Sequence, residues 1–158
     1  MRVLTRTILP IALVILILDR LTKWYVVDVL DLPNQIGPDG AAGAMDVWPP
    51  FLNLRMAWNT GINFGLGSDV SPWILIAIAV GISLALIVWA TWRGSVAIGI
   101  GAGLIVGGAI GNTWDRATDW GAVADFLNMS CCGIDNPFSF NVADIAIFLG
   151  AVWVALRA

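Results

Sequence analysis

The sequence predicts an all-α membrane protein with four transmembrane helices, in a single domain over residues 1–158. Of the 158 residues, 59% are hydrophobic and 12% are charged, and the mean hydropathy is +0.86. Soluble domains carry about 25% charged residues, so this composition excludes an ordinary soluble domain. The apolar residues are gathered into four segments of bilayer-spanning length, which we place at residues 8–29, 72–92, 96–114 and 140–157.

The first segment begins like a signal peptide, because two arginines precede an apolar run from Ile8 to Leu18. No small-residue cleavage site follows the run, and further apolar segments come later, so we expect a retained helix. Asp19 and Lys23 are four residues apart and share a helix face, with the acid on the N-terminal side that favours an ion pair. The pair is either structural, near the membrane interface, or faces a wet interior cavity.

Residues 45–66 are expected to form a β-like segment outside the membrane. From Leu52 to Asn59, apolar residues alternate with polar or small ones, which is the period of a strand rather than a helix. One face would be apolar, and the other would carry Asn53 and Arg55. From Asn59 to Gly65 the glycines indicate a turn. The turn is either a simple bend or a place where amides and free backbone groups hold an extended peptide by strand-like pairing.

Glycine recurs every fourth residue in the third apolar segment. This spacing is typical of close helix packing; alternatively, a substrate helix docks against the glycine face. At the end of the same segment, Asn112 and Arg116 share a helix face below the loop that carries Asp125. The four glycines of the face are Gly99, Gly103, Gly107 and Gly111.

The charges predict an orientation in the membrane. Four arginines lie at one end of the apolar segments with no acid among them: Arg2, Arg6, Arg93 and Arg157. An excess of positive charge marks the cytoplasmic side. We therefore expect both termini in the cytoplasm and the acidic loops, with Asp125 and Asp144, at the outer surface.

The residue types present exclude several chemistries. The chain has no His and no Glu, so it cannot build a Ser-His-Asp triad, a Cys-His pair or a His-ligated metal site. Acid–base work falls to the eleven aspartates, or to the one Lys or the one Tyr. A net charge of −3 without a basic run gives no footprint for nucleic acid, and no nucleotide-binding fingerprint occurs. We expect no metal, no cofactor and no nucleic-acid partner.

Two aspartates stand in apolar sequence, Asp125 after Val123-Ala124 and Asp144 after Val142-Ala143. A carboxylate in such surroundings is costly to ionise, and two that come close cannot easily both be charged. One pKa then rises and the pair shares a proton, as in aspartic proteases. The alternative is that each acid caps a helix or lies in headgroup water.

The two cysteines are adjacent, at Cys131 and Cys132. A vicinal pair is poorly placed for a structural cross-link and too small for a metal cage. The cysteines are either incidental loop residues or a redox pair, and outside the cytoplasm they would be open to oxidation.

Five motifs occur in order along nearly the whole chain. They are Asp19-x-x-Thr22-Lys23, Asn59-x-Gly61-x-x-Phe64, Gly107-Gly108-x-x-Gly111-Asn112-x-x-Asp115-Arg116, Val123-x-Asp125-Phe126 and Phe140-Asn141-x-Ala143-Asp144. In these motifs the chain resembles the lipoprotein signal peptidases, also called signal peptidase II. The resemblance implies a catalytic dyad of Asp125 and Asp144. It also implies that eight residues support or line the site: Asp19, Lys23, Asn59, Gly61, Gly108, Asn112, Arg116 and Asn141.

The same resemblance implies a small extramembrane β cradle and a short helix-bearing loop on the outer face, over the site. Asn63 departs from the family pattern, and so does the insert around Cys131 to Pro137. Both departures concern the loops rather than the dyad.

The implied activity is that of a membrane aspartic endopeptidase in the bacterial inner membrane, surrounded by membrane lipid. Its substrate would be a prolipoprotein, cut on the N-terminal side of a diacylglyceryl-modified Cys. An ionised Asp would activate water and its protonated partner would donate to the scissile carbonyl. We expect the protein to function as a monomer. Two other classes stay open: a proton-coupled transporter, which would hold its acids near the midplane, and a membrane thiol oxidoreductase, which would use Cys131 or Cys132.

Overall fold

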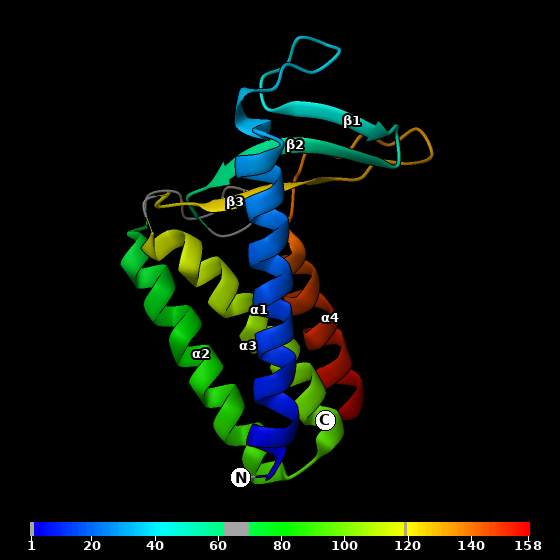
Figure 1. The fold of residues 1–158 in the computed structure, drawn as a ribbon. Coiled ribbons are helices and arrows are strands. Elements are labelled where there is room, and N and C mark those ends of the chain that lie inside the picture. The colour runs from blue at the N-terminus through cyan, green and yellow to red at the C-terminus, as the bar shows by residue number, and fades with distance from the viewer. Residues whose placement is uncertain (1, 62–69, 119) are drawn as a thin grey trace.

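The computed structural model describes residues 2–61, 70–118 and 120–158. Over these residues, long helices stand side by side beneath a three-stranded antiparallel sheet (Figure 1). The two ends of the chain lie at the end of the bundle opposite the sheet. The protein is therefore mostly helical, as the sequence predicts, with a small sheet at one end.

The first helix begins earlier than the predicted segment 8–29. It runs without a break through the π-helical turn Leu4–Ile8, the α-helix α1 (Leu9–Trp24) and a second π-helical turn, Tyr25–Val29. Pro10 lies inside this continuous helix, directly after the first π-helical turn, and it has no backbone N–H to donate to the preceding turn. The chain then enters a short 3₁₀ turn, Leu32–Asn34, on the sheet side of the molecule.

α2 (Pro72–Arg93) and α3 (Val96–Ala117) form a tight helical hairpin. Pro72 occupies the first position of α2, where its fixed φ suits a helix. Gly94 ends α2 in the left-handed region at a φ of 66°, and the Ser95 side chain accepts a backbone N–H at the start of α3. Within the described part of the chain, these are the two helices that are long and apolar enough to cross a membrane.

α4 (Val142–Arg157) begins two residues after the start of the predicted segment 140–157. The reason is that Asn141 is the N-cap of the helix: its side chain accepts a hydrogen bond from Asp144 N, and the Asp144 side chain accepts one from Asn141 N. This reciprocal arrangement is a capping box, which fixes where the helix starts.

α3 is the central helix and contacts α1, α2 and α4. Its four regularly spaced glycines face the first helix, and a Cβ added to Gly107 would lie 2.7 Å from the Ala12 carbonyl oxygen. Gly108 faces the other way, against Ala143 of α4. The packing interpretation of the glycine face is therefore confirmed. The alternative, a substrate helix docked on that face, is wrong because the first helix occupies it.

The sheet confirms the predicted strand over residues 52–59 and corrects its details. A bulge interrupts the pairing with β3 between Leu54 and Ala57. Asn53 and Leu54, which precede the bulge, are both buried, so burial does not follow the predicted alternation. The outer segment predicted over 45–66 is a hairpin of two strands up to residue 59, and residues 62–66 lie outside the described residues. The strands pair in the order β1-β2-β3: β1 (Ala44–Trp48), β2 (Leu52–Asn59) and β3 (Val123–Asn128).

The segment that carries Asp125 is a strand, β3, rather than the loop that the sequence predicts. One edge of β3 pairs with β2. At the other edge, Phe126 N and Leu127 N donate to the Phe140 carbonyl oxygen, and Phe140 N donates to Leu127 O. Because almost every residue of β3 is buried, its sequence has no alternation, and a period-two pattern could not reveal it.

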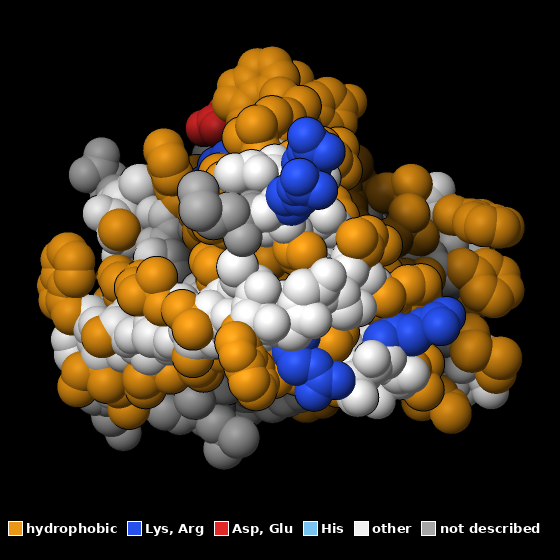
Figure 2. Space-filling view, turned by 90° about the horizontal axis from the view of Figure 1, so that it is seen from below, with side chains coloured by type: hydrophobic (Ala, Val, Ile, Leu, Met, Phe, Trp, Pro, Cys, Tyr) orange, Lys and Arg blue, Asp and Glu red, His pale blue; other side chains and the backbone are white. Residues whose placement is uncertain are grey.

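Figure 2 looks at the end of the bundle opposite the sheet, where Lys and Arg side chains are spread among hydrophobic ones. Large hydrophobic side chains also cover the outside of the helices; Trp92, for example, is 81% exposed. Such a surface is suited to lipid rather than to water. The four arginines of the predicted charge asymmetry are all exposed: Arg2, Arg6, Arg93 and Arg157.

We predict that Gly107→Ala destabilises the protein, whereas Gly81→Ala does not. Both substitutions bring the same gain in helix propensity, about 1 kcal/mol. At Gly107 the new Cβ would lie 2.7 Å from the Ala12 carbonyl oxygen, whereas nothing lies within 4 Å at Gly81. Overpacking costs about 1–3 kcal/mol, so the thermal midpoint in detergent should fall only for Gly107→Ala. Equal midpoints would contradict the close packing of the first helix on α3.

Candidate active site

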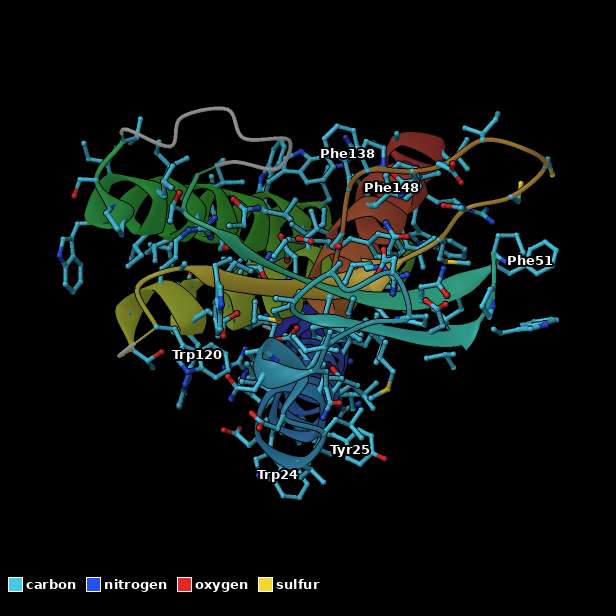
Figure 3. The ribbon with its side chains drawn as sticks, turned by 90° about the horizontal axis from the view of Figure 1, so that it is seen from above. Trp24, Tyr25, Phe51, Trp120, Phe138 and Phe148 are labelled. Atoms are coloured by element: carbon cyan, nitrogen blue, oxygen red, sulfur yellow. The ribbon has the colours of Figure 1, made fainter. Side chains whose placement is uncertain are left out.

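The candidate site lies where the sheet meets the ends of the helices. Asp125 is in β3, Asp144 is in the first turn of α4, and Asn112 is in the C-terminal part of α3. Asn59 ends β2 and Asn141 caps α4. Figure 3 looks down on this end of the molecule and shows the strands crossing over the helices. We call Asp125 and Asp144 the carboxylate pair.

Asp125 is almost fully buried, with 3% of its surface exposed. Its Oδ1 accepts a hydrogen bond from Asn141 Nδ2 at 2.7 Å, and its Oδ2 accepts one from Asn59 Nδ2 at 3.1 Å. Burial, and then the charge of Asp144, raise the pKa of Asp125 to about 7, while the two amides and Lys23 oppose the shift only in part. A carboxyl with such a pKa can hold or release a proton near neutral pH.

Asp144 is held from two directions. Its Oδ1 accepts a hydrogen bond from Asn112 Nδ2 at 2.8 Å, and its Oδ2 accepts one from Asn141 N at 3.3 Å. The second contact belongs to the capping box, so the helix-capping role considered for this residue is confirmed. Asp144 nevertheless also acts on Asp125, because its charge contributes to the raised pKa of that carboxyl.

Asn141 and Asn112 join the two carboxylates. Asn141 Nδ2 donates to Asp125 Oδ1 at 2.7 Å and to Asn112 Oδ1 at 3.1 Å, while Asn141 Oδ1 accepts from Asp144 N at 2.9 Å. Lys23 Nζ, which can only donate, lies 3.2 Å from Asn112 Oδ1. The Nδ2 of Asn112 must therefore point the other way, toward Asp144. The orientations of both amides follow from their fixed neighbours.

A buried ion-pair network of two acids and two bases lies beside the carboxylate pair. Lys23 Nζ is 3.0 Å from Asp19 Oδ2 and 2.7 Å from Asp115 Oδ2. Arg20 pairs with the same two acids and lies 2.9 Å from Asp19 Oδ2. Asp19, Lys23 and Asp115 are all fully buried. The ion pair predicted between Asp19 and Lys23 is confirmed, and it lies in the interior.

The two acids of this network also hold the backbone beside the carboxylate pair. Asp19 Oδ1 accepts a hydrogen bond from Ala143 N at 3.2 Å, and Asp115 Oδ2 accepts one from Ala124 N at 3.3 Å. Ala143 and Ala124 each directly precede one member of the pair. The network therefore fixes the main chain beside both carboxylates.

The remaining predicted site residues lie around this centre. Arg116 donates to the Gly61 carbonyl oxygen at 2.6 Å and to the Asn112 carbonyl oxygen at 3.5 Å. Gly61 N donates to Asn59 Oδ1 at 3.1 Å, which links the Arg116 contact to a partner of the carboxylate pair. Gly108 packs against Ala143 and Ile147 of α4. Asn63, singled out above as a departure from the family pattern, lies outside the described residues.

Two members of the network, Arg20 and Asp115, were not among the predicted site residues. A signal for Asp115 was present in the spacing of the glycine face. Gly111 faces the first helix, and a residue four positions later lies on the same face. An acid there, at the end of an apolar helix, is placed to meet Lys23. No helical spacing predicts the role of Arg20. It is adjacent to Asp19 in sequence, and adjacent residues on a helix do not share a face.

Known proteins resemble this chain over most of its length. A family model described as signal peptidase (SPase) II matches residues 11–158. The lipoprotein signal peptidase of Nitrobacter hamburgensis is 38% identical over 147 residues, which cover 89% of this chain and 84% of the relative. The lipoprotein signal peptidase of Rhizorhabdus wittichii is 37% identical and covers 94% of this chain, with 83% of its own length aligned. A solved bacterial membrane enzyme has the same fold, with a TM-score of 0.77 and 27% identity over 94% of this chain and 85% of its own.

A buried carboxyl in the sheet and a second one at the start of an apolar helix are suited to the chemistry of an aspartic membrane peptidase. Among the described residues, no three side chains of His, Cys, Asp or Glu are grouped so that they could hold a metal ion. The carboxyl groups of Asp125 and Asp144 can accept and donate protons. The chain belongs to the signal peptidase II family.

We predict that Asp115→Asn destabilises the protein far more than Asp46→Asn. Asp115 is fully buried against Lys23 and Arg20, and breaking a buried ion pair costs about 3–5 kcal/mol. Asp46 pairs with Arg55 at 2.6 Å, but the two side chains are 31% and 30% exposed, and such a pair contributes about 0–1 kcal/mol. Denaturant unfolding in detergent measures both. A loss for Asp115→Asn as small as that for Asp46→Asn would contradict a structural role for the network.

Proposed function

We propose that this chain removes the signal peptide from bacterial prolipoproteins, with Asp125 and Asp144 as its catalytic dyad. The observation that carries the proposal is the coupling of the two carboxyls. Asn141 contacts both of them, through its side chain and through its main chain, and the charge of Asp144 helps to raise the pKa of Asp125 to about 7. Two carboxyls coupled in this way share one proton near neutral pH.

The two carboxyls would divide the acid and base roles. Asp125, protonated below about pH 7, would donate its proton to the carbonyl oxygen of the scissile bond. Asp144, held by Asn112 and Asn141, would take a proton from the attacking water, whose oxygen adds to the carbonyl carbon. On collapse of the tetrahedral intermediate, the proton held by Asp144 passes to the leaving amine, and the proton on the former carbonyl oxygen returns to Asp125.

The substrate that fits best is a prolipoprotein whose signal helix lies in the bilayer. Cleavage would fall on the N-terminal side of its diacylglyceryl-modified Cys. Arg116, bound to the Gly61 carbonyl oxygen, would hold Gly61 beside the dyad. The lipid chains would remain in the membrane between the helices.

The proposal includes a placement in the bacterial inner membrane. All four helices would span the bilayer, the first and fourth together with the two that length and composition qualify. The exposed arginines opposite the sheet support a cytoplasmic location for both termini. The sheet would then be the cradle on the outer face, a short helix-bearing loop would cover the site, and one copy of the chain would suffice for activity.

The two other classes fit less well. A proton-coupled transporter would hold its acids at the midplane between broken helices, whereas Asp125 lies in the sheet and Asp144 at the start of α4. A thiol oxidoreductase would need Cys131 or Cys132 beside its substrate site. Neither cysteine is among the groups that shift the pKa of Asp125, and membership of a peptidase family favours neither class.

We predict that Asp125→Asn and Asp144→Asn each abolish processing. Loss of a general acid or base lowers the rate about 10²–10⁴-fold. Because the two carboxyls act in one step, the double variant should be scarcely slower than either single one. The measurement is cleavage, by purified protein in detergent, of a diacylglyceryl-modified precursor and of the same precursor without the lipid, and only the lipidated precursor should be cut.

The control for these variants is Asp39→Asn, which removes an exposed carboxylate of the outer loop and should leave the rate unchanged. Full processing by either dyad variant at normal expression would reject the aspartic mechanism. Equal cleavage of both precursors would instead remove lipid recognition from the proposal while leaving the dyad intact.

The raised pKa of Asp125 predicts how activity depends on pH. Asp125 acts as an acid, so kcat/KM should be high below about pH 7 and fall as the pH rises through that value. The Asn59 hydrogen bond lowers the pKa of Asp125, since it favours the charged carboxylate. Asn59→Ala should therefore move the descending limb of the profile to higher pH. A limb that stays in place, or moves to lower pH, would exclude Asp125 as the group that titrates.

A further inference from the structure

The loop between β3 and α4 carries the vicinal cysteines at its tip. It spans residues 129–140 and reaches beyond the helices, beside the β1–β2 hairpin (Figures 1 and 3). Cys131 and Cys132 are both exposed, and their Sγ atoms lie 2.7 Å apart. The peptidase mechanism proposed above uses neither thiol.

A tight turn brings the two sulfurs together. Ile134 N donates to the Cys131 carbonyl oxygen at 2.9 Å. The two central residues both have positive φ values, 59° at Cys132 and 79° at Gly133. This hydrogen bond and two successive positive φ values are features of a type I′ turn. A left-handed conformation is uncommon for a residue with a Cβ, so the turn depends on the segments that hold it.

Both arms of the loop are held by hydrogen bonds. Ser130 N donates to the Pro50 carbonyl oxygen at 3.1 Å, and Asn136 N donates to Ser130 Oγ at 3.0 Å. Asn128 Nδ2 donates to the carbonyl oxygens of Asn136 and Phe138 at 2.8 and 3.0 Å. The arms are thereby fixed to each other and to the β1–β2 connection, and the two thiols are presented together at the surface.

We propose that Cys131 and Cys132 form a reversible dithiol–disulfide site, which is oxidised by exchange with an external disulfide. A disulfide bond is about 2.05 Å long, so the two sulfurs need only a short further approach. Either thiol, once ionised, can attack first, and the other then closes the ring.

The exchange proceeds in two steps. The thiolate of one cysteine attacks one sulfur of the external disulfide, which forms a mixed disulfide and releases one thiolate. The second cysteine then loses its proton to solvent and attacks Sγ of the first. This second step closes the Cys131–Cys132 bond and releases the other thiolate. The two cysteines together lose two electrons, and the external disulfide gains them and is reduced to two thiols.

The disulfide should be easily reduced. The Cα atoms of adjacent residues are about 3.8 Å apart across a trans peptide, which is shorter than the usual lower limit of about 4.4 Å for bridged cysteines. Strained and exposed disulfides have the more oxidising potentials and are the labile ones. The site would therefore follow the redox state of its surroundings. Its exposure to an oxidising compartment rests on the topology proposed above, but its chemistry can be tested without that topology.

The test is to treat the purified full-length protein in detergent with oxidised glutathione and to measure its intact mass. The wild type should lose the mass of two hydrogen atoms, resist iodoacetamide, and regain both thiols with excess reduced glutathione. Cys131→Ser and Cys132→Ser, which alter exposed side chains, should each keep one glutathione adduct because no second thiol can displace it. A wild type that keeps its adducts, or does not react, would overturn the proposal.

Gly133→Ala tests whether the turn holds the pair in position. A Cβ at a positive φ is strained, and the expected slowing of ring closure from the mixed disulfide is roughly fivefold. Gly40→Ala is the matched control, because Gly40 has the same φ of 79° and, like Gly133, nothing within 4 Å of an added Cβ. It should close at the wild-type rate. Equal rates for both variants would show that the turn does not organise the thiols. None of these outcomes depends on peptidase activity, so they are independent of the proposed function.

Discussion

The rest of the site depends on the charge compensation of Lys23. Its ammonium group is fully buried and lies within 3.0 Å of both Asp19 and Asp115. A buried cation without such partners would cost several kcal/mol, so the three residues have to occur together. The two acids have oxygens left over, and these bind the backbone beside Asp125 and Asp144. The two acids that neutralise Lys23 therefore also position the backbone beside Asp125 in β3 and Asp144 in α4.

The same burial gives Asp125 its unusual proton affinity. Desolvation and the charge of Asp144 raise its pKa, and three weaker influences lower it: Asn59, Lys23 and Asn141. The balance leaves a pKa of about 7, between a permanently ionised carboxylate and a permanently neutral one. If the amides were removed, the value would move upward, and if the carboxyl were exposed, it would move down. The donors around Asp125 therefore tune its proton affinity as well as orient it.

The sequence predicts the elements with a strong period and misses those without one. The apolar helices, the alternating strand over residues 52–59 and the Asp19–Lys23 pair all follow local rules, and the structure confirms them. The sequence pattern does not predict β3, because this strand is buried on both faces and paired at both edges and therefore has no alternation of apolar and polar residues. The bulge at Leu54–Ala57 and the contact of Arg20 with Asp115 are set by segments far apart in the chain, so no short stretch of sequence contains them.

The helix-capping role of Asp144 and the catalytic role that we propose for it do not exclude each other. The capping box uses one carboxylate oxygen, which accepts Asn141 N. The other oxygen accepts Asn112 Nδ2, and Lys23 fixes the direction of that amide from behind. With both oxygens bound, the plane of the carboxylate is set before any substrate arrives. The contacts that start α4 therefore also orient the carboxylate that we propose as the base. Asn141 caps the helix and also binds Asp125, so the start of α4 and the geometry of the carboxylate pair form a single structural feature.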